Sequence, residues 1–384
     1  MILIDATPLQ SEHRFRGVGT YVLALSQALI GRAPERIQFV LAQNTLAPVA
    51  PAIAAKAGYR AYRPHKPAQL YWLYNELFLR RALWCAKPQL FHATDFNGVV
   101  RVPGVITVAT LHDLTPLKEH SPQPASFSRP SEFFSQWRWR VYFRKIRFTH
   151  HLIAISHQVK ADAVTRLNIP PERISVIYPG IDLAKFQKPW PQPPAPSQPR
   201  YFLAIGPREP HKNFDRLLEA FRMVSRQIPD LHLAIAGRWQ PADVRWLTQV
   251  LGQWRLQDRV SYLGYVSEPV FLALLQHAMA LVYPSLEEGF GLPIVEAMAA
   301  GTPVLTSNVG APKEVAGSAA LLVNPTDTPA IADGMRQLAT LPRLERHYRA
   351  RGLARSQQFS WSAVADQTLA VYDALLAERT PKGS

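Results

Sequence analysis

The sequence predicts an α/β protein of two domains, each built on a mainly parallel β-sheet. A length of 384 residues exceeds what one hydrophobic core usually holds, so two domains are expected. Short apolar runs alternate with helical patterns along most of the chain, which is the order of strand–helix–strand units. A proline-rich stretch in the middle of the chain separates two such series.

The apolar runs place the strands. In the first half they are Ile2–Ala6, Ile37–Leu41, Gln89–His92, Val105–Leu111, His151–Ile155 and Ile174–Tyr178. In the second half they are Tyr201–Ile205, Leu231–Ala236, Val260–Leu263, Ala278–Tyr283, Thr302–Thr306 and Ala319–Val323. Between the two series, residues 181–200 contain Pro-Trp-Pro-Gln-Pro-Pro-Ala-Pro-Ser-Gln-Pro, which favours a stiff linker over a helix or a central strand. We therefore predict a first domain at 1–182, a linker at 183–200, a second domain at 201–360 and a C-terminal helix within 361–384.

Composition narrows the class of protein. The hydrophobic fraction of 47% and the charged fraction of 18% are typical of a folded globular chain. A single cysteine, Cys85, rules out an internal disulfide, and the N-terminus shows no signal-peptide pattern, so a cytoplasmic protein is expected. The net charge of +15 leaves three partners open: nucleic acid, an anionic membrane surface or a phosphorylated small substrate.

Residues 278–306 read as strand, glycine loop, short helix and strand. Pro293 suits the first position of the helix, and Gly301 suits the position after its end. The loop then lies at the carboxyl edge of the sheet, where open α/β sheets bind ligands. Gly289 and Gly291 allow the backbone to approach a ligand, and the helix start favours an anion.

Two carboxylates flank this predicted phosphate site. Glu288 lies on the loop, and Glu296 is expected in the first turn of the helix. They would repel a phosphate unless each had a hydroxyl to bind, and sugar and ribose hydroxyls fit that need.

A second loop, residues 206–213, follows the strand Tyr201–Ile205 and leads into a helix from Phe214. It carries Arg208 and Lys212, and cations on a loop that caps a helix predict a diphosphate site. In the first half, Gly17 and Gly19 precede a helical pattern, but their spacing from the first strand disfavours NAD binding. His112 and Asp113 follow the strand Val105–Leu111, without the nucleophile elbow of a hydrolase.

These motifs resemble family 4 of the retaining glycosyltransferases. The resemblance rests on Glu288 and Glu296 within Glu-Gly-Phe-Gly-Leu-Pro-Ile-Val-Glu-Ala-Met-Ala-Ala-Gly-Thr-Pro-Val, on Glu209-Pro-His-Lys-Asn and on His112-Asp-Leu. The chain departs from the family pattern at Pro207, where many members carry the arginine that here stands at Arg208. It departs again at residues 310 and 311, where Gly and Ala replace two serines.

The resemblance implies the GT-B architecture, with two Rossmann-like domains facing a cleft and the C-terminal helix crossing back to the first domain. It implies that Lys212 and Arg208 hold the donor diphosphate, Glu296 the ribose and Glu288 the sugar, which His112 also reaches. The implied donor-binding residues are Gly17, Gly19, Gly206, Lys212, Glu288, Gly289, Phe290, Gly291, Leu292 and Glu296. The implied catalytic residues are His112, Arg208, Lys212 and Glu288.

The expected reaction is transfer of a hexose, with mannose or glucose favoured, from a GDP-, UDP- or ADP-linked donor with retention of anomeric configuration. The acceptor, whether glycan, lipid or small molecule, stays open. No Asp-x-Asp motif occurs, so neither a metal ion nor another cofactor is expected.

Arg140, Arg144 and Arg147 fall on one face of a predicted helix, beside an aromatic face. A solvated helix of the sheet domain is favoured over a peripheral contact with the anionic inner membrane surface. Nucleic acid is disfavoured because no binding motif accompanies the charge. Two other classes remain as alternatives: a nicotinamide-dependent oxidoreductase or epimerase, and a non-catalytic basic protein that binds nucleic acid or membrane.

Overall fold

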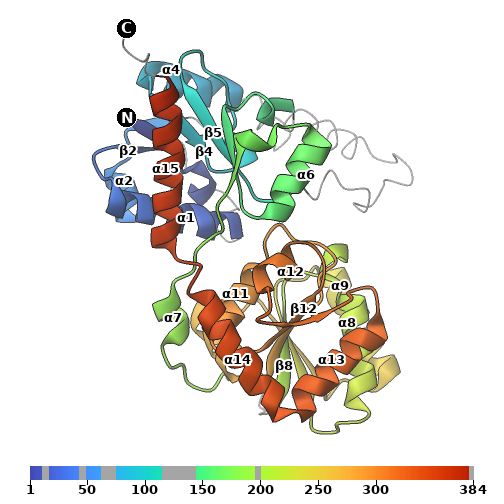
Figure 1. The fold of residues 1–384 in the computed structure, drawn as a ribbon. Coiled ribbons are helices and arrows are strands. Elements are labelled where there is room, and N and C mark those ends of the chain that lie inside the picture. The colour runs from blue at the N-terminus through green and yellow to red at the C-terminus, as the bar shows by residue number, and fades with distance from the viewer. Residues whose placement is uncertain (11–16, 43–48, 62–74, 115–143, 195–199, 380–384) are drawn as a thin grey trace. The chain divides into compact units, whose positions relative to one another are not determined.

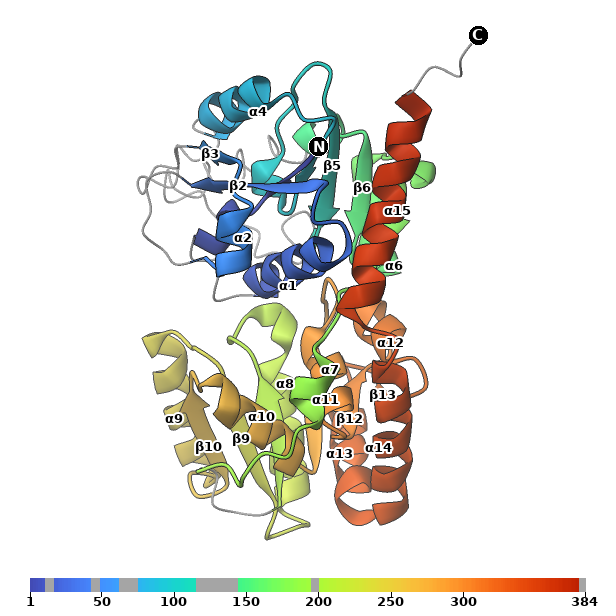
Figure 2. The ribbon, with the colours of Figure 1, turned by 90° about the vertical axis from the view of Figure 1, so that its left-hand side faces the viewer.

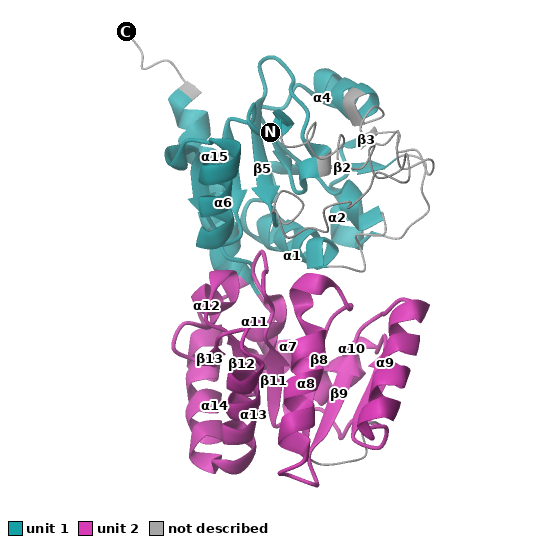
Figure 3. Ribbon diagram, turned by 90° about the vertical axis from the view of Figure 1, so that its right-hand side faces the viewer, with its two compact units in different colours: residues 1–180, 361–384 teal, residues 181–360 magenta. Residues whose placement is uncertain are grey.

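The computed structural model describes the chain except for residues 11–16, 43–48, 62–74, 115–143, 195–199 and 380–384 (Figure 1). Contacts divide it into two compact units, residues 1–180 with 361–384 and residues 181–360 (Figure 3). The C-terminal helix therefore belongs to the first unit. The second unit begins at Ile181, two residues before the predicted linker of residues 183–200, and includes that stretch.

The first unit is built on a seven-stranded parallel sheet in the order β3-β2-β1-β4-β5-β6-β7. Its strands are β1 (Ile2–Asp5), β2 (Ile37–Ala42), β3 (Tyr59–Ala61), β4 (Leu90–Ala93), β5 (Ile106–Leu111), β6 (His151–Ala154) and β7 (Ile174–Val176). The residues of β1, β4 and β5 are all buried, as expected for central strands covered on both faces.

The helices of the first unit connect these strands. They are α1 (Gly17–Arg32), α2 (Pro51–Ala55), α4 (Arg80–Ala86), α6 (His157–Leu167) and α15 (Trp361–Arg379), with short 3-10 or π turns at Thr7–Gln10, Asn75–Leu79, Phe96–Gly98 and Pro171–Arg173. The last helix, α15, packs against the first, α1 (Figure 2). The two ends of the chain thus contribute to one packed unit.

The second unit holds a six-stranded parallel sheet in the order β10-β9-β8-β11-β12-β13. Its strands are β8 (Tyr201–Ile205), β9 (His232–Ala236), β10 (Val260–Gly264), β11 (Ala280–Tyr283), β12 (Val304–Ser307) and β13 (Leu321–Val323). In sequence order this is the arrangement 3-2-1-4-5-6 of a doubly wound Rossmann fold. The predicted α/β class with parallel sheets is confirmed.

The helices of the second unit are α7 (Leu183–Gln187), α8 (Phe214–Ser225), α9 (Pro241–Trp254), α10 (Glu268–His277), α11 (Leu292–Ala299), α12 (Gly310–Ala316), α13 (Thr328–Thr340) and α14 (Pro342–Ser356). Helices α8, α9 and α13 share a hydrophobic core with alternate strand residues such as Phe202, Ala204 and Leu233. Alternate residues point to one face of a strand, so this core covers one face of the sheet.

The prediction that residues 181–200 contain no helix is wrong for Leu183–Gln187, which form α7. Leu183–Gln187 is helical because Asp182 caps it, with Lys185 N donating to Asp182 Oδ1 at 3.3 Å. The segment after it is fastened to α10: Gln276 Nε2 donates to Lys188 O at 2.8 Å, and Trp190 N donates to Gln276 Oε1 at 2.9 Å. The start of the proline-rich stretch is therefore fixed to the second unit by hydrogen bonds and is not a free linker.

The sequence also missed β3, which is only three residues long and lies at the edge of the first sheet. Arg140 lies outside the described residues, so the predicted arginine face is described only in part, with Arg144 and Arg147 exposed. None of the helices in the described ranges is both long and apolar enough to cross a membrane.

Candidate active site

The order of the second sheet places two loops side by side. Strand β8 pairs with β9 on one side and with β11 on the other, so the connections after β8 and β11 leave in opposite directions. At such a switch point the loops at the carboxyl ends of the strands diverge and leave room for a ligand. The loop after β8 carries Lys212, and the loop after β11 carries Glu288.

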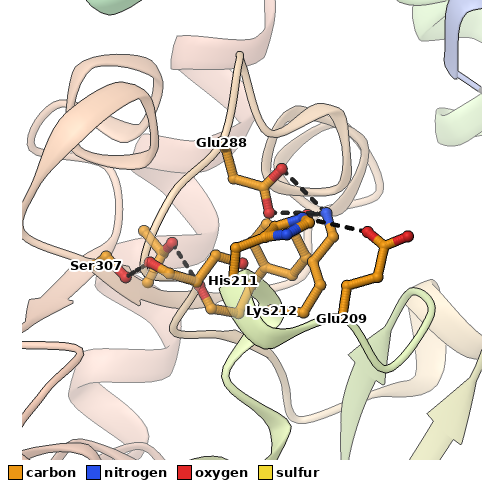
Figure 4. A network of polar contacts seen from close by, with 8 residues as sticks. Glu209, His211, Lys212, Glu288 and Ser307 are labelled. Carbon is orange, nitrogen blue, oxygen red and sulfur yellow. Dashed lines mark hydrogen bonds and ion pairs between the residues drawn. The ribbon is translucent and has the colours of Figure 1, made fainter. Parts of the chain in front are cut away.

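Lys212 and Glu288 point toward one another across this switch point (Figure 4). Lys212 Nζ donates to Glu288 Oε1 at 2.8 Å and to Glu288 Oε2 at 3.0 Å. It also donates to the hydroxyl of Tyr283, the last residue of β11, at 2.7 Å. The Lys212 and Glu288 side chains are only 14% and 10% exposed. The ammonium group therefore uses its three hydrogens within a nearly buried cluster.

The charges of this cluster follow from its contacts. Burial by itself would lower the pKa of Lys212, but Tyr283 and Glu288 outweigh burial and raise that pKa above its ordinary value. Burial, helped by Glu288, raises the pKa of Tyr283 well above its ordinary value. At neutral pH the cluster thus contains a lysine cation beside a neutral phenol.

Backbone and amide contacts fix the two loops to each other. Leu286 N donates to His211 O at 2.8 Å, which joins the loop after β11 to the 3-10 turn Pro210–Lys212. Asn213, buried in a left-handed conformation with φ 61°, donates through Nδ2 to Pro284 O at 2.9 Å and to Pro325 O at 2.7 Å. His211 Nε2 lies 3.4 Å from Glu209 Oε2 beside the Lys212 cluster (Figure 4). These contacts fix the position of the turn that carries Lys212.

Glycines line the same edge of the sheet. Gly206 follows β8 with φ 122°, and a Cβ there would lie 3.7 Å from Lys212 Cε. Gly237 follows β9 with φ 152°, and a Cβ there would lie 2.3 Å from Gly206 O. Both glycines have a positive φ that an ordinary side chain rarely adopts, and at Gly237 there is no room for a Cβ either. At these two positions the edge of the sheet beside Lys212 therefore consists of main-chain atoms without side chains.

The glycine loop after β11 leads into α11 as predicted, with one correction. Gly291 caps the helix with φ 98°, and Gly301 follows its end with φ 76°. Because α11 begins at Leu292, Pro293 is its second residue and Glu296 its fifth, so Glu296 does not lie in the first turn. Phe290 is 3% exposed, with its ring 5.8 Å from that of Phe359, so its side chain packs inside the second unit and only its main chain is available to a ligand.

Glu296 has surroundings different from those of Glu288. Protein atoms crowd its carboxyl although the residue is partly exposed, and this desolvation raises its pKa to about 7. The nearby charges partly cancel, since Lys185 lowers this pKa and Glu268 raises it. Lys185 and Glu268 are themselves ion-paired. Glu296 is thus a desolvated acid on the helix that follows the glycine loop.

Arg208 is not in the Lys212 cluster. Its Nη1 donates to Asp243 Oδ1 at 2.9 Å, and its Nη2 donates to Asp215 Oδ1 at 2.9 Å. Its guanidinium carbon also lies 3.7 Å from the ring centroid of Trp246. In this structure the Arg208 charge is balanced by aspartates of α8 and α9.

His112 belongs to the first unit, directly after β5, and is 9% exposed. Its Nε2 donates to Thr94 O at 2.8 Å, because a carbonyl oxygen only accepts. When the ring is neutral, Nδ1 is therefore an acceptor. Gly17 and Gly19 form the first turn of α1 in the same unit, with Gly17 exposed and Gly19 buried.

The structure therefore brings together Lys212, Glu288 and Gly206, and it places Gly289, Gly291, Leu292 and Glu296 on the adjoining loop and helix. Sequence reasoning missed Tyr283 and Asn213. Tyr283 ends an apolar strand and was counted only as part of it. The Lys-Asn pair of residues 212 and 213 was a signal for Asn213, whose buried amide holds the loop that bears Glu288.

Two family models match the chain. The model described as Glycosyltransferase Family 4 matches residues 15–185, and the model described as Glycosyl transferases group 1 matches residues 187–355. The chain is 30% identical over 327 residues to O-antigen chain mannosyltransferase B from Escherichia coli, covering 79% of each chain. It is 32% identical over 241 residues to O-antigen chain mannosyltransferase RfbU from Salmonella typhimurium, covering 61% of this chain and 65% of that one.

Solved structures give the same fold. Sucrose-phosphate synthase from Thermosynechococcus elongatus superposes with a TM-score of 0.76 at 22% identity, covering 98% of this chain and 99% of that one. HepE from Anabaena, in complex with UDP and glucose, superposes with a TM-score of 0.71 at 19% identity, covering 97% of this chain and 99% of that one. With both sheets, both family models and these relatives in agreement, the chain belongs to family 4 of the glycosyltransferases and is an enzyme of the GT-B fold.

Proposed function

We propose that this enzyme transfers a hexose, mannose or glucose, from a nucleotide-diphosphate sugar to an acceptor with retention of anomeric configuration. The observation that carries the proposal is the Lys212 cation at the switch point of a Rossmann sheet, beside a glycine-lined edge and the start of α11. A nearly buried cation, a glycine-lined edge and a helix start together favour a diphosphate.

The relatives support the class of sugar. Mannosyltransferases are among the similar curated proteins, together with a glycogen synthase from Mycobacterium tuberculosis that is 29% identical over 319 residues. HepE has been solved with UDP-glucose. The sugars named for these similar proteins support mannose or glucose as the transferred sugar. The nucleotide of the donor and the acceptor are to be identified by experiment.

Donor binding would require an exchange of partners at Lys212. Its three hydrogens contact Tyr283 and Glu288, so a phosphate oxygen is bound only when a Glu288 contact is given up. We infer that Glu288 then accepts a hydrogen bond from a sugar hydroxyl, while Tyr283 keeps Lys212 in place. Glu288 thereby moves away from the bound phosphate and contacts a neutral hydroxyl. This removes the repulsion between the carboxylate and the phosphate.

Bond cleavage at the anomeric carbon transfers an electron pair to the leaving diphosphate. Lys212 and the positive end of the α11 helix dipole would stabilise that charge as it develops. The acceptor hydroxyl would attack the same face of the sugar and give its proton to the leaving phosphate oxygen, which accounts for retention. His112 Nδ1 would accept a hydrogen bond from a sugar hydroxyl, and Glu296 would accept from the ribose.

Arg208 has a smaller part in this scheme. Its guanidinium would reach a diphosphate only by leaving Asp215 and Asp243, so its charge is less available than that of Lys212. A metal ion has no assigned role, because Lys212 and the helix start supply the positive potential.

The test combines a binding screen with product analysis. Thermal shifts against GDP-, UDP- and ADP-linked mannose and glucose identify the donor, since ligand at about 100 times Kd should stabilise by about 2.7 kcal/mol. Proton NMR of the product formed on a simple acceptor then reads the anomeric configuration. We expect the α configuration of the donor in the product. An inverted product, or stabilisation by NAD alone, would refute the proposal.

A further inference from the structure

A chain of buried polar groups joins the C-terminal helix to the sheet of the first unit. The Tyr372 hydroxyl, on α15, lies 2.5 Å from His92 Nδ1 on β4. His92 Nε2 lies 2.8 Å from Thr110 Oγ1 on β5. Thr110 Oγ1 in turn lies 3.5 Å from the hydroxyl of Tyr21 on α1. Four side chains from four elements thus form one continuous hydrogen-bonded path inside the core.

The path is buried. Tyr372, His92 and Thr110 are 0% exposed, and Tyr21 is 2% exposed. Burial, followed by the neighbouring His112, lowers the pKa of His92 to about 3, so its ring is neutral. A neutral imidazole donates through one nitrogen and accepts through the other, so the bond to Tyr372 and the bond to Thr110 depend on each other through the His92 tautomer. Removing the Tyr372 hydroxyl therefore changes the hydrogen bonding of His92 and, through it, of Thr110.

The path ends against His112. The Tyr21 ring meets the His112 ring edge-on, with centroids 4.9 Å apart and an angle of 86° between the planes. The Tyr21 ring also contacts Trp361, the first residue of α15, with centroids 5.6 Å apart. His112 is fixed on its other side by the bond from Nε2 to Thr94 O. The orientation of the His112 ring therefore depends on where Tyr21 is held.

We propose that Tyr372 is a positioning residue for His112, acting through His92, Thr110 and Tyr21. The C-terminal helix then does more than pack against α1, because it sets the direction in which His112 Nδ1 points. The inference rests on the proposed function, in which His112 binds the sugar of the donor. A hydroxyl buried with no stabilising or functional role would instead be a liability in a hydrophobic core.

Tyr372→Phe tests the proposal, and Thr368→Val is its matched control. Thr368 lies one turn earlier on α15, is 0% exposed, and its hydroxyl has no hydrogen-bond partner among the described residues. Both variants delete one buried hydroxyl from the same helix. We expect Tyr372→Phe to lower kcat by about 2- to 10-fold with donor KM nearly unchanged, the range for one neutral hydrogen bond. Thr368→Val should leave kcat as in the wild type.

Thr110→Val breaks the path at its centre without altering α15. If the path acts as a unit, the double variant Tyr372→Phe/Thr110→Val should lose no more kcat than the more damaging single variant. Additive losses, or equal losses in Tyr372→Phe and Thr368→Val, would overturn the proposal in favour of a general packing role.

Nitrogen-15 NMR of the histidine side chains separates this inference from the proposed function. We expect the His112 ring signals to shift in Tyr372→Phe and to stay unchanged in Thr368→Val. A wild-type enzyme without transfer from any nucleotide sugar would refute the proposed function, while the His112 signals would still test the path. Unchanged His112 signals in Tyr372→Phe would refute the path even in a fully active enzyme.

Discussion

Lys212 Nζ lies 2.8 Å and 3.0 Å from the two carboxylate oxygens of Glu288, a residue 76 positions further along the chain. The ion pair joins the two loops that diverge from the switch point of the second sheet. The residue proposed to hold the diphosphate and the residue proposed to hold the sugar thus bind each other in this structure.

Glu288→Gln should separate nucleotide binding from turnover. The amide removes the charge that competes for Lys212, so nucleoside diphosphate should bind as tightly as to the wild type, or more tightly. The contact to the reorganising sugar is weakened, so kcat should fall. Calorimetry with the free nucleotide and steady-state kinetics measure the two effects. A tenfold loss of nucleotide affinity in Glu288→Gln would contradict the assigned role.

Glu296 should make nucleotide affinity depend on pH. Its pKa of about 7 in the folded protein means that the carboxylate which would bind ribose hydroxyls forms only as pH rises through neutrality. Nucleoside diphosphate affinity should therefore rise from pH 6 to pH 8. The nucleotide itself also titrates, so the comparison is with Glu296→Gln, whose affinity should be lower and rise less. Parallel pH profiles for the two proteins would remove the ribose assignment.

The same shift has a consequence for stability. The unfolded chain loses the Glu296 proton near its ordinary pKa, whereas the folded chain keeps it until about pH 7. The unfolded state thus binds fewer protons in this interval, and the contribution of Glu296 to stability falls as pH rises from about 4.5 to 7. Glu296→Gln should gain stability relative to the wild type over the same interval. Denaturation midpoints at pH 5 and pH 8 check the sign, and a relative loss in the variant at pH 8 would contradict it.

Gly237→Ala should destabilise the second unit strongly. The new Cβ would lie 2.3 Å from Gly206 O, and the φ of 152° is strained for alanine. Strain and overpacking together should reduce the free energy of unfolding by about 2–5 kcal/mol. Gly252→Ala in α9 is the control, since its Cβ would meet only Gln257 at an ordinary 3.7 Å and should stabilise by up to about 1 kcal/mol. Equal denaturant midpoints for the two variants would show that the glycine edge is not tightly packed.

Turnover should tolerate metal chelation. Lys212 and the start of α11 provide the positive potential that a divalent ion supplies in other transferases. Activity measured in EDTA should match activity without it. Loss of turnover in EDTA that magnesium or manganese restores would contradict this prediction and show that catalysis depends on a divalent ion.

Much of the fold follows from the sequence because buried parallel strands are continuous apolar runs. Every strand of the second sheet lies within or beside such a run. The strand β3 was missed because Tyr59–Ala61 is short, contains an arginine and lies at the sheet edge. Helix α7 was missed because the proline run dominated the prediction, although Asp182 supplies a helix cap before the first proline.

Most residues of the candidate site could be predicted from the sequence, but the contacts between them could not. The glycine loops and the two glutamates were found from residue type and spacing, and the strand order confirms that the Lys212 and Glu288 loops are neighbours. The partners of Arg208 were not predictable, because Asp215 and Asp243 come from two different helices. Tyr283 was missed because periodicity says which face of a strand is buried but not what a hydroxyl at its end will meet.

The assignment of Lys212 to the donor diphosphate is tested most directly by calorimetry of nucleoside diphosphate binding to the wild type, Lys212→Met and Lys188→Met. Lys188 follows α7, with its ammonium 5.1 Å from the centroid of the Trp190 ring, and takes no part in the proposed site. Loss of a charged hydrogen bond of about 1.5–3 kcal/mol predicts affinity about 10- to 100-fold weaker in Lys212→Met and unchanged in Lys188→Met. If Lys212→Met binds the nucleotide as tightly as the wild type, Lys212 does not hold the donor diphosphate.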